Sequence, residues 1–436
     1  MRRRTLLTGA VAAGVATTAT TGTAATAAGA APATEVPRQP VMTGLEALEA
    51  DGWAALAGQR VGMISNPTGV NRDYVHAVDL MHADERVDIV AVFGPEHGFR
   101  GSAQAGGSEG EGIDERTGLT VYDAYGANET KFATMFTRAE VQTVVFDIQD
   151  VGARFYTYIW TMYRSMIAAA RLGLRYVVLD RPNPIGGEAY GPMMTPAYTS
   201  GVGVREIVLQ HGMTVGELAR FFNAEFLARE GGAVDLEVVW AKGWRRDVLF
   251  GDIDVPWVLP SPNMPTPDTA LVYPGTAMFE GVANIAEGRG TTRPFELIGG
   301  PSMDYHWGDR INARNLPGVR FREAYFKPLS GGNKFPNQLC NGVEVKVTDR
   351  YAYDPIRTAV AMLVDAKVDP DFAWRQDAWD TRRPYWIDKL TGSTRLREQI
   401  DAGADVDEVV GAWAGELADF RARRKPYLHY VGPVSP

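Results

Sequence analysis

Short apolar runs alternate with helix-like runs along the first half of the chain, from about residue 44 to residue 240. Strand-like runs of four to eight apolar residues, each bounded by turn residues, are typical of buried strands. When such strands alternate with helices, they indicate a parallel sheet covered by helices, which is an α/β fold. The predicted strands are "RVGMIS" (60–65), "VDIVAVF" (87–93), "QTVVFDI" (142–148), "RYVVLD" (175–180) and "DLEVVW" (235–240).

The helices between these strands are predicted by apolar residues at helical spacing in 74–84, 158–172 and 214–230. Thr214 and Glu217 have the spacing of a capping box, which marks the start of the last of them.

The pattern changes after a proline-rich stretch at 255–274, which we interpret as a rigid crossover. Beyond it the chain is rich in glycine, arginine and aromatic residues, with a strand at 343–349 and helices near 355–367 and 394–422. A chain of 436 residues is long for one core. We therefore predict a first domain over 41–265 and a smaller α+β domain over 266–436.

Composition narrows the possible partners. The net charge is −9 and no long basic run is present, which argues against nucleic acid and anionic membrane surfaces. The single cysteine, Cys340, has no partner for an intramolecular disulfide, and we expect it to be a buried apolar residue.

The first 33 residues read as an export signal rather than as part of the fold. A positive start is followed by small and apolar residues, and Arg3-Arg4-Thr5-Leu6-Leu7 resembles a twin-arginine signal. We expect an exported protein that is not inserted in the membrane once the signal is removed.

Polar and glycine-rich loops follow four of the predicted strands, at 66–69, 94–101, 149–158 and 181–187. Ligands of open parallel sheets bind outside the carboxyl ends of the strands, so these loops are expected to form one wall of a site. Asp147 and Gln149 point to the same side if their strand continues. The candidate site residues of this wall are Glu96, His97, Arg100, Asp147, Gln149, Arg154, Tyr156 and Asn183.

A second candidate loop is "FEGVANIAEGRGTTRPFELIGGP" (279–301). Gly288 and Gly290 permit a close approach of backbone, and backbone N–H groups with guanidinium groups can hold an anion. Loop solvation, helix capping and core packing remain alternatives for the candidates of both loops. The second group of candidates is Glu280, Glu287, Arg289, Thr291 and Arg293.

The sequence offers no pattern for a cofactor or a metal. It has no H-E-x-x-H, no Cys/His cluster, no P-loop and no G-x-G-x-x-G. Ser108 matches G-x-S-x-G, but it does not follow a strand, as a nucleophile elbow requires. We predict no cofactor and no metal.

Longer motifs in order along the chain carry a family resemblance. They are "GPEHGFRG", "FDIQDVGARFYTYIWTM", "VLDRPNPIGG", "MTVGELARFFN", "SPNMPTPDTALVYPGTAMFEG" and "EGRGTTRPFELIG". Together they resemble the exo-β-N-acetylmuramidases of the NamZ/YbbC type, a family of glycoside hydrolases. The resemblance implies a Rossmann-like domain with a smaller second domain and an active site in the cleft between them. It also implies release of terminal N-acetylmuramic acid from the non-reducing end of peptidoglycan fragments, with Glu96 as the catalytic glutamate.

The hypothesis for the mechanism needs two carboxyl groups beside the scissile bond, or one together with the acetamido group of the substrate. Glu96 is the predicted general acid/base, and Glu287 the predicted second carboxylate, with Asp147 and Asp150 as alternatives. A cation beside Glu96 would oppose its protonation, so we expect His97 or Arg100 to bond elsewhere.

Arg154, Arg289 or Arg293 is expected to pair with the lactyl carboxylate of the substrate. Two other functions stay open: a glycan-binding protein without catalysis on the same scaffold, and an amidase or esterase. The second would need a Ser or Cys nucleophile, or a metal. The sequence does not determine the oligomeric state.

Overall fold

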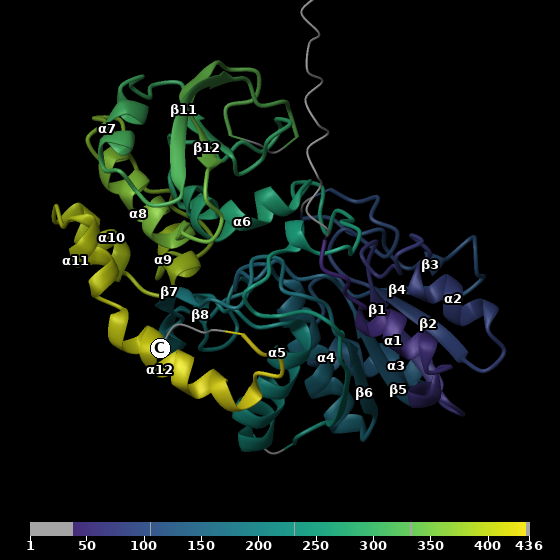
Figure 1. Cartoon of the computed structure of the whole chain (residues 1–436). Coiled ribbons are helices and arrows are strands. Elements are labelled where there is room, and N and C mark those ends of the chain that lie inside the picture. Colours follow the sequence, from purple (N-terminus) through teal and green to yellow (C-terminus); the bar gives the residue numbers. More distant parts are fainter. Residues whose placement is uncertain (1–37, 105, 231, 332–333, 433–436) are drawn as a thin grey trace, which may run out of the picture. The chain divides into compact units, whose positions relative to one another are not determined.

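A seven-stranded sheet forms the centre of the first half of the chain in the computed structural model, which describes residues 38–432 except 105, 231, 332 and 333 (Figure 1). Its strand order is β3-β4-β2-β1-β5-β6-β9, and the neighbouring strands are parallel except for the β3–β4 pair. The five predicted strands are confirmed as β1, β2, β5, β6 and β9. The strands are β1 (Arg60–Ser65), β2 (Asp88–Gly94), β3 (Gly112–Ile113), β4 (Thr120–Asp123), β5 (Thr143–Asp147), β6 (Arg175–Leu179) and β9 (Asp235–Val239).

The strand order reverses beside β1. From β1 the chain adds β2 and β4 on one side, and then returns to add β5, β6 and β9 on the other side. Ligands of such sheets bind at this reversal, beyond the carboxyl ends of the strands. The loops after β1, β2 and β5 therefore meet at the place where a site is expected.

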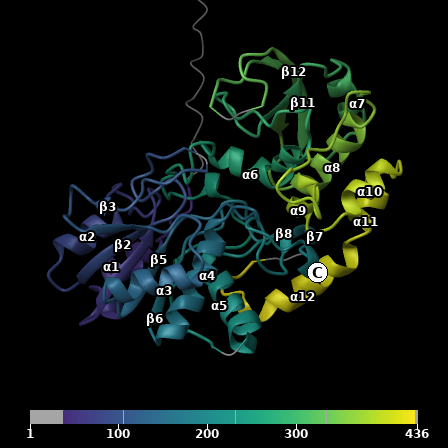
Figure 2. The same ribbon diagram turned by 180° about the vertical axis from the view of Figure 1, so that it is seen from behind.

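Helices cover both faces of the sheet (Figures 1 and 2). Alternate strand residues point to opposite faces, so one set packs against α1 and α2, and the other against α3, α4 and α5. The predicted capping box of Thr214 and Glu217 is confirmed at the start of α5. The helices are α1 (Gly44–Ala50), α2 (Ala77–Ala83), α3 (Glu129–Arg138), α4 (Tyr158–Leu172) and α5 (Val215–Phe222), which continues through a π-helical turn (Asn223–Leu227).

The second half of the chain contains a three-stranded antiparallel sheet with the order β10-β12-β11, packed against helices. This is the predicted smaller α+β part, and Cys340 at the start of β12 is fully buried, as predicted. Burial raises the pKa of the Cys340 thiol to about 11. The elements are α6 (Pro267–Thr276), β10 (Leu297–Gly300), α7 (Trp307–Ala313), β11 (Val319–Phe326), β12 (Cys340–Val347), α8 (Pro355–Ala366) and α9 (Trp386–Thr391).

Two sequence predictions for this half need correction. The proline-rich stretch is not a crossover throughout, because its second part forms α6, which the side chain of Thr266 caps and which begins with Pro267. Proline suits the first position of a helix because its missing N–H has no partner there. The segment predicted as helical near 394–422 is divided into α10 (Arg395–Asp401), α11 (Val406–Gly411) and α12 (Ala414–Arg424). Gly403, at φ 84°, lies in the first break, and the capping box of Asp405 starts α11.

The end of the described chain returns to the first half. Helix α12 contacts β7 (Tyr190–Met193), which pairs with β8 (Val208–Gln210) in a separate two-stranded sheet. Arg424 donates hydrogen bonds to three backbone carbonyls there, and the Tyr430 hydroxyl donates one to Asp180. The chain from Arg38 onward packs as one unit, and the predicted boundary at 265/266 stays a prediction.

The predicted signal at 1–33 lies outside the described residues. Within the described part, no helix has the length and apolar character that crossing a membrane would require. Seven shorter helical segments, mostly single 3-10 turns, connect the larger elements, and one of them, η6 (Ala277–Gly281), carries a residue of the site.

Candidate active site

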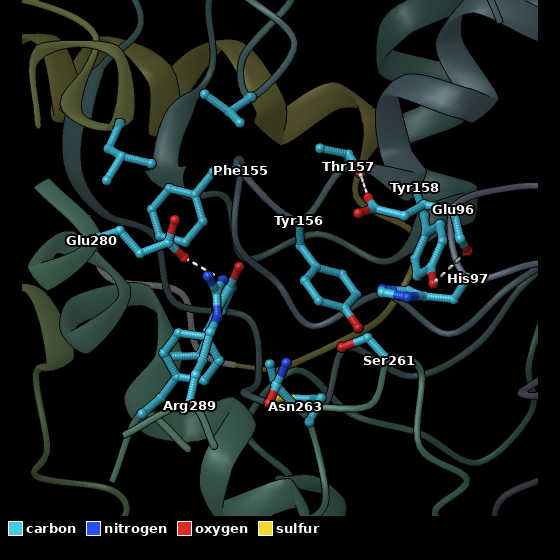
Figure 3. Close-up of a pocket in the computed structure, with 15 residues that line it drawn as sticks. Glu96, His97, Phe155, Tyr156, Thr157, Tyr158, Ser261, Asn263, Glu280 and Arg289 are labelled. Carbon is cyan, nitrogen blue, oxygen red and sulfur yellow. Dashed lines mark hydrogen bonds and ion pairs between the residues drawn. The ribbon is translucent and has the colours of Figure 1, made fainter. Parts of the chain in front are cut away.

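A pocket lies where the strand-end loops of the first half face the second half (Figure 3). Concave sites that combine apolar surface with a few polar groups are typical of small-ligand binding. The first half supplies Glu96, His97, Phe155, Tyr156, Thr157, Tyr158, Val202, Ser261, Asn263 and Met264, and the second half supplies Tyr273, Glu280, Arg289, Phe295 and Leu390. This pocket lies between the two halves, where the site was predicted.

Glu96 follows strand β2 and reaches the pocket from a loop of unusual backbone. His97 and Gly98 both have positive φ, at 70° and 84°, and a Cβ at Gly98 would overlap the side chain of Glu109. The Glu96 carboxylate accepts a hydrogen bond from the Gly106 N–H at 3.0 Å and one from the Thr157 hydroxyl at 3.3 Å (Figure 3). Both donors are uncharged. They fix the carboxylate without supplying a cation.

The two basic residues after Glu96 bond in different ways. The Nδ1 of His97 lies 3.0 Å from the carbonyl oxygen of Ala103, so Nδ1 carries the proton and donates it to that oxygen. Arg100 forms ion pairs with Asp79 and Asp114 at 2.9 and 2.8 Å. The expectation that one of them bonds elsewhere is confirmed for Arg100. Its guanidinium is engaged outside the pocket, and its contact with substrate stays a prediction.

A row of aromatic rings crosses the pocket between its two polar ends. Tyr156 lies edge-on to both Tyr158 and Tyr273, with ring centroids 5.3 and 5.7 Å apart. Tyr273 in turn lies edge-on to Phe295 at 4.7 Å. In Figure 3, Tyr156 lies between Glu96 at one end and the Glu280–Arg289 pair at the other. Such rings offer apolar surface to the apolar faces of a sugar.

Arg289 is the cation of the second end. Its Nη2 lies 2.5 Å from Glu280 Oε1, and its guanidinium lies over the Phe295 ring at 5.1 Å. Burial alone would lower the pKa of Arg289, but the carboxylates of Glu280 and Glu287 raise it above its ordinary value. Within the described part of the chain its one hydrogen bond is to Glu280. The remaining N–H groups of this fork are available to an anionic ligand.

Glu287 is not among the described residues that line the pocket. Its Oε2 lies 3.1 Å from Lys334 Nζ, and its Oε1 lies 3.8 Å from Arg289 Nη1. Burial would raise the pKa of Glu287, but Lys334 and Arg289 hold it below its ordinary value. The role of Glu287 as second catalytic carboxylate stays a prediction, and the structure places this carboxylate between Lys334 and Arg289. The carboxylate that lines the pocket together with Glu96 is Glu280.

The polar residues after β5 and β6 bind one another rather than a ligand. Asp147 and Arg181 form a buried ion pair, with Asp147 Oδ2 at 2.9 Å from Arg181 Nη2. Gln149 donates to the carbonyls of Asp150 and Pro182. Asp150 accepts from the Gly152 N–H and lies 3.1 Å from His211 Nε2, and Asn183 donates to the Met213 carbonyl. Asp147, Gln149 and Asn183 are buried and do not line the pocket, and their substrate contacts stay predictions.

Arg154 is fully buried and does not reach the pocket. Its guanidinium donates to the backbone carbonyls of Pro192, Ile207 and Leu390. Burial lowers the pKa of Arg154 to about 9. Its pairing with a substrate carboxylate stays a prediction. The residue joins three segments of the chain.

Thr291 and Arg293 are also directed away from the pocket. The Thr291 hydroxyl donates to the Gly288 carbonyl at 2.6 Å. Arg293 Nη1 lies 2.7 Å from Glu296 Oε2. Neither lines the pocket, and their substrate contacts stay predictions, whereas Arg289 is the arginine of this loop that lines the pocket.

Several pocket residues were not predicted. Ser261 and Asn263 lie between the prolines of "LPSPNMP", where polar side chains in a stiff segment were the available signal. Thr157 was adjacent to a predicted residue, and Tyr273 and Phe295 are aromatic residues of apolar stretches that the sequence did not single out. Their periodicity does not separate a ring that faces a pocket from one that faces a core.

Known proteins resemble this chain over most of its length. Family models described as exo-β-N-acetylmuramidase NamZ, N-terminal and C-terminal, match residues 61–268 and 271–430. The chain is 43% identical over 394 residues to the peptidoglycan β-N-acetylmuramidase NamZ of Bacillus subtilis (strain 168), over 89% of this chain and 91% of that protein.

The fold is similar to crystal structures of two DUF1343 family proteins from Bacteroides fragilis NCTC 9343. The first has a TM-score of 0.81 and 32% identity, over 91% of this chain and 100% of that chain. The second has a TM-score of 0.72 and 30% identity, over 90% and 99% of the two chains.

Proposed function

The chain belongs to the exo-β-N-acetylmuramidase NamZ family, and on that premise we propose that it releases β-linked N-acetylmuramic acid from the non-reducing end of peptidoglycan fragments. It is a glycosidase whose substrate derives from peptidoglycan. The observation that carries the proposal is the Glu96 carboxylate, which lines a pocket shared by both halves and is held by uncharged donors.

Glu96 acts in this proposal as the general acid. It gives its proton to the glycosidic oxygen as the bond from that oxygen to C1 breaks, and the leaving sugar departs as an alcohol. Glu96 then takes a proton from the water that adds to C1. The Gly106 N–H and the Thr157 hydroxyl hold its two oxygens in place during both steps.

Glu280 supplies the second carboxylate of the pocket. Its ion pair with Arg289 and the hydrogen bond from Trp386 Nε1 at 3.4 Å fix it at the end remote from Glu96 (Figure 3). A fixed negative charge in a pocket stabilises the positive charge that develops on the sugar ring.

Arg289 is the residue that we assign to the lactyl carboxylate of N-acetylmuramic acid. It lines the pocket, and the described structure leaves N–H groups of its guanidinium without hydrogen bonds. A guanidinium fork matches a carboxylate with two parallel hydrogen bonds. An N-acetylglucosaminide lacks that carboxylate, so this contact favours the muramide.

The test is turnover of a chromogenic β-N-acetylmuramide by the mature protein, beside the matching β-N-acetylglucosaminide. The expected result is release from the muramide at a rate far above the slow release from the glucosaminide. If folded protein releases neither chromophore but binds wall disaccharide, the proposal of an enzyme is wrong and the non-catalytic alternative is favoured. An unchanged rate in the presence of a chelator would further argue against a metal-dependent amidase or esterase.

The proposal extends to where the protein acts. We infer export, by the twin-arginine route, from Arg3-Arg4 and the small and apolar residues that follow. A peptidoglycan substrate outside the cytoplasm is consistent with it. Replacing both arginines by lysine is expected to leave the full chain inside the cell, as measured by fractionation. Secretion of the lysine variant at the wild-type level would contradict this route.

A further inference from the structure

Lys334 is a buried lysine that holds three backbone carbonyls beside the pocket. Its ammonium donates to the carbonyl oxygens of Phe279, Val282 and Ile285 at 2.7, 2.7 and 2.9 Å. It comes from the connection between β11 and β12, about fifty positions further along the chain. Its side chain is 19% exposed. An ammonium has three N–H donors, and the three carbonyls use all of them.

The same ammonium lies 3.1 Å from Glu287 Oε2. The other oxygen of Glu287 lies 3.8 Å from Arg289 Nη1. Burial alone would favour the neutral forms of both Lys334 and Glu287, and their mutual attraction opposes this. Glu287 is therefore an anion shared by two cations, of which one, Arg289, lines the pocket.

The carbonyls that Lys334 binds belong to the segments that carry the two carboxylates around Arg289. Phe279 directly precedes Glu280, and Ile285 lies two positions before Glu287. Lys334 consequently fixes the separation between Glu280 and Glu287, and it neutralises Glu287 at Oε2, whereas Arg289 lies nearer Oε1. Without the ammonium, Glu287 would have only Arg289 as a counterion and would compete with an anionic ligand for its guanidinium.

We propose that Lys334 is a positioning residue for Arg289 and thereby a determinant of the preference for the lactyl-bearing sugar. The proposal rests on the proposed muramidase function. Lys334 does not line the pocket and does not touch the substrate. It acts through Glu287 and through the turn that carries Glu280.

The test compares Lys334→Met with Lys327→Met. Lys327 is an exposed lysine in the same connection, so the control removes the same charge from the same loop. For Lys334→Met we expect KM for the muramide to rise about tenfold, with a smaller change in kcat. The ratio of kcat/KM for muramide over glucosaminide is expected to fall about tenfold, because the glucosaminide has no carboxylate to lose. Lys327→Met is expected to keep all wild-type values.

Two further measurements guard against a general loss of folding. In Lys334→Ala, added ethylammonium is expected to restore part of the lost preference for the muramide over the glucosaminide, since the small cation can occupy the position of the lysine ammonium. Glu287→Gln keeps Lys334 with its three carbonyls and removes the anion between the cations. It is expected to change the ratio with little loss of thermal stability.

A wild-type protein without muramidase turnover would overturn the proposed function and this inference with it. If the wild type is active and folded Lys334→Met has the same ratio of kcat/KM for muramide over glucosaminide, the inference alone is overturned. If Lys334→Met does not fold, an unchanged ratio in Glu287→Gln overturns it instead. Lys334 would be a structural residue only, if its replacement lowers kcat for both substrates by the same factor. In that case the ratio of kcat/KM for muramide over glucosaminide does not change, and ethylammonium does not restore activity.

Discussion

The two ends of the pocket hold their carboxylates by different means. At the acid end, which comprises Glu96, Gly106 and Thr157, the carboxylate accepts hydrogen bonds from a backbone N–H and a hydroxyl. At the ionic end, which comprises Glu280, Arg289, Glu287 and Lys334, each carboxylate is paired with at least one cation. The ionic end therefore already balances its negative charges with cations, whereas the carboxylate at the acid end has no cation bonded to it in the described part of the chain. The comparison separates a group suited to proton transfer from groups suited to charge recognition.

The largest expected effect is at the acid end. Glu96→Gln keeps the size of the side chain and removes the transferable proton, so kcat for the muramide should fall by about 10²–10⁴-fold. KM should change little, because the ionic end is intact. Steady-state kinetics on the chromogenic muramide measure both values. Near-normal turnover by the purified, folded variant would remove Glu96 from the proposed mechanism.

Arg289→Ala should affect recognition instead. We expect kcat/KM for the muramide to fall about a hundredfold, with a much smaller loss for the glucosaminide. Arg293→Ala is the matched control, because Arg293 belongs to the same loop but pairs with Glu296 outside the pocket. Equal losses on the two substrates in Arg289→Ala would contradict an assignment to the lactyl carboxylate.

Thr157→Val should have a smaller effect at the acid end. It removes one uncharged hydrogen bond to the Glu96 carboxylate and preserves the shape of the side chain. A bond of this kind is worth about a factor of ten or less, so a severalfold fall in kcat is expected. The preference between the two substrates should stay at its wild-type value. A changed preference with normal kcat would show that the two ends are not independent.

The last prediction concerns stability rather than turnover. Burial raises the pKa of Asp180 to about 7, so the folded protein holds a proton that the unfolded chain has already released. The stabilisation from this group is complete at acid pH and is lost as the pH rises through 7. The melting temperature of Asp180→Asn should therefore depend less on pH than that of the wild type between about pH 5 and 7.5. Parallel melting curves for the two proteins across this range would contradict the raised pKa.

The sequence predicted those features that depend on neighbouring residues in the chain, such as apolar runs and ionisable residues at strand ends. Strands such as β1 and β5 follow from their apolar runs, and Glu96 stands out because it is an ionisable residue at a strand end. Asp147 and Arg181 carry the same local signal, yet they form a buried pair with each other, 34 positions apart. Whether a polar strand-end residue faces a ligand depends on partners that are distant in sequence. For the same reason Lys334 could not be connected with Glu287 before the fold was known.

The return of the chain end to the first half also bears on when the protein can fold. Arg424 and the carbonyl of Gly187 are 237 positions apart, and Tyr430 and Asp180 are 250 positions apart. While the first half emerges from the ribosome, the Gly187 carbonyl and Asp180 lack the partners that the chain end supplies, and the Asp180 side chain has only Thr214 and Gly216. Contacts of such long range also slow folding, because a large loop must close before they form. Completion of the first half is thus post-translational.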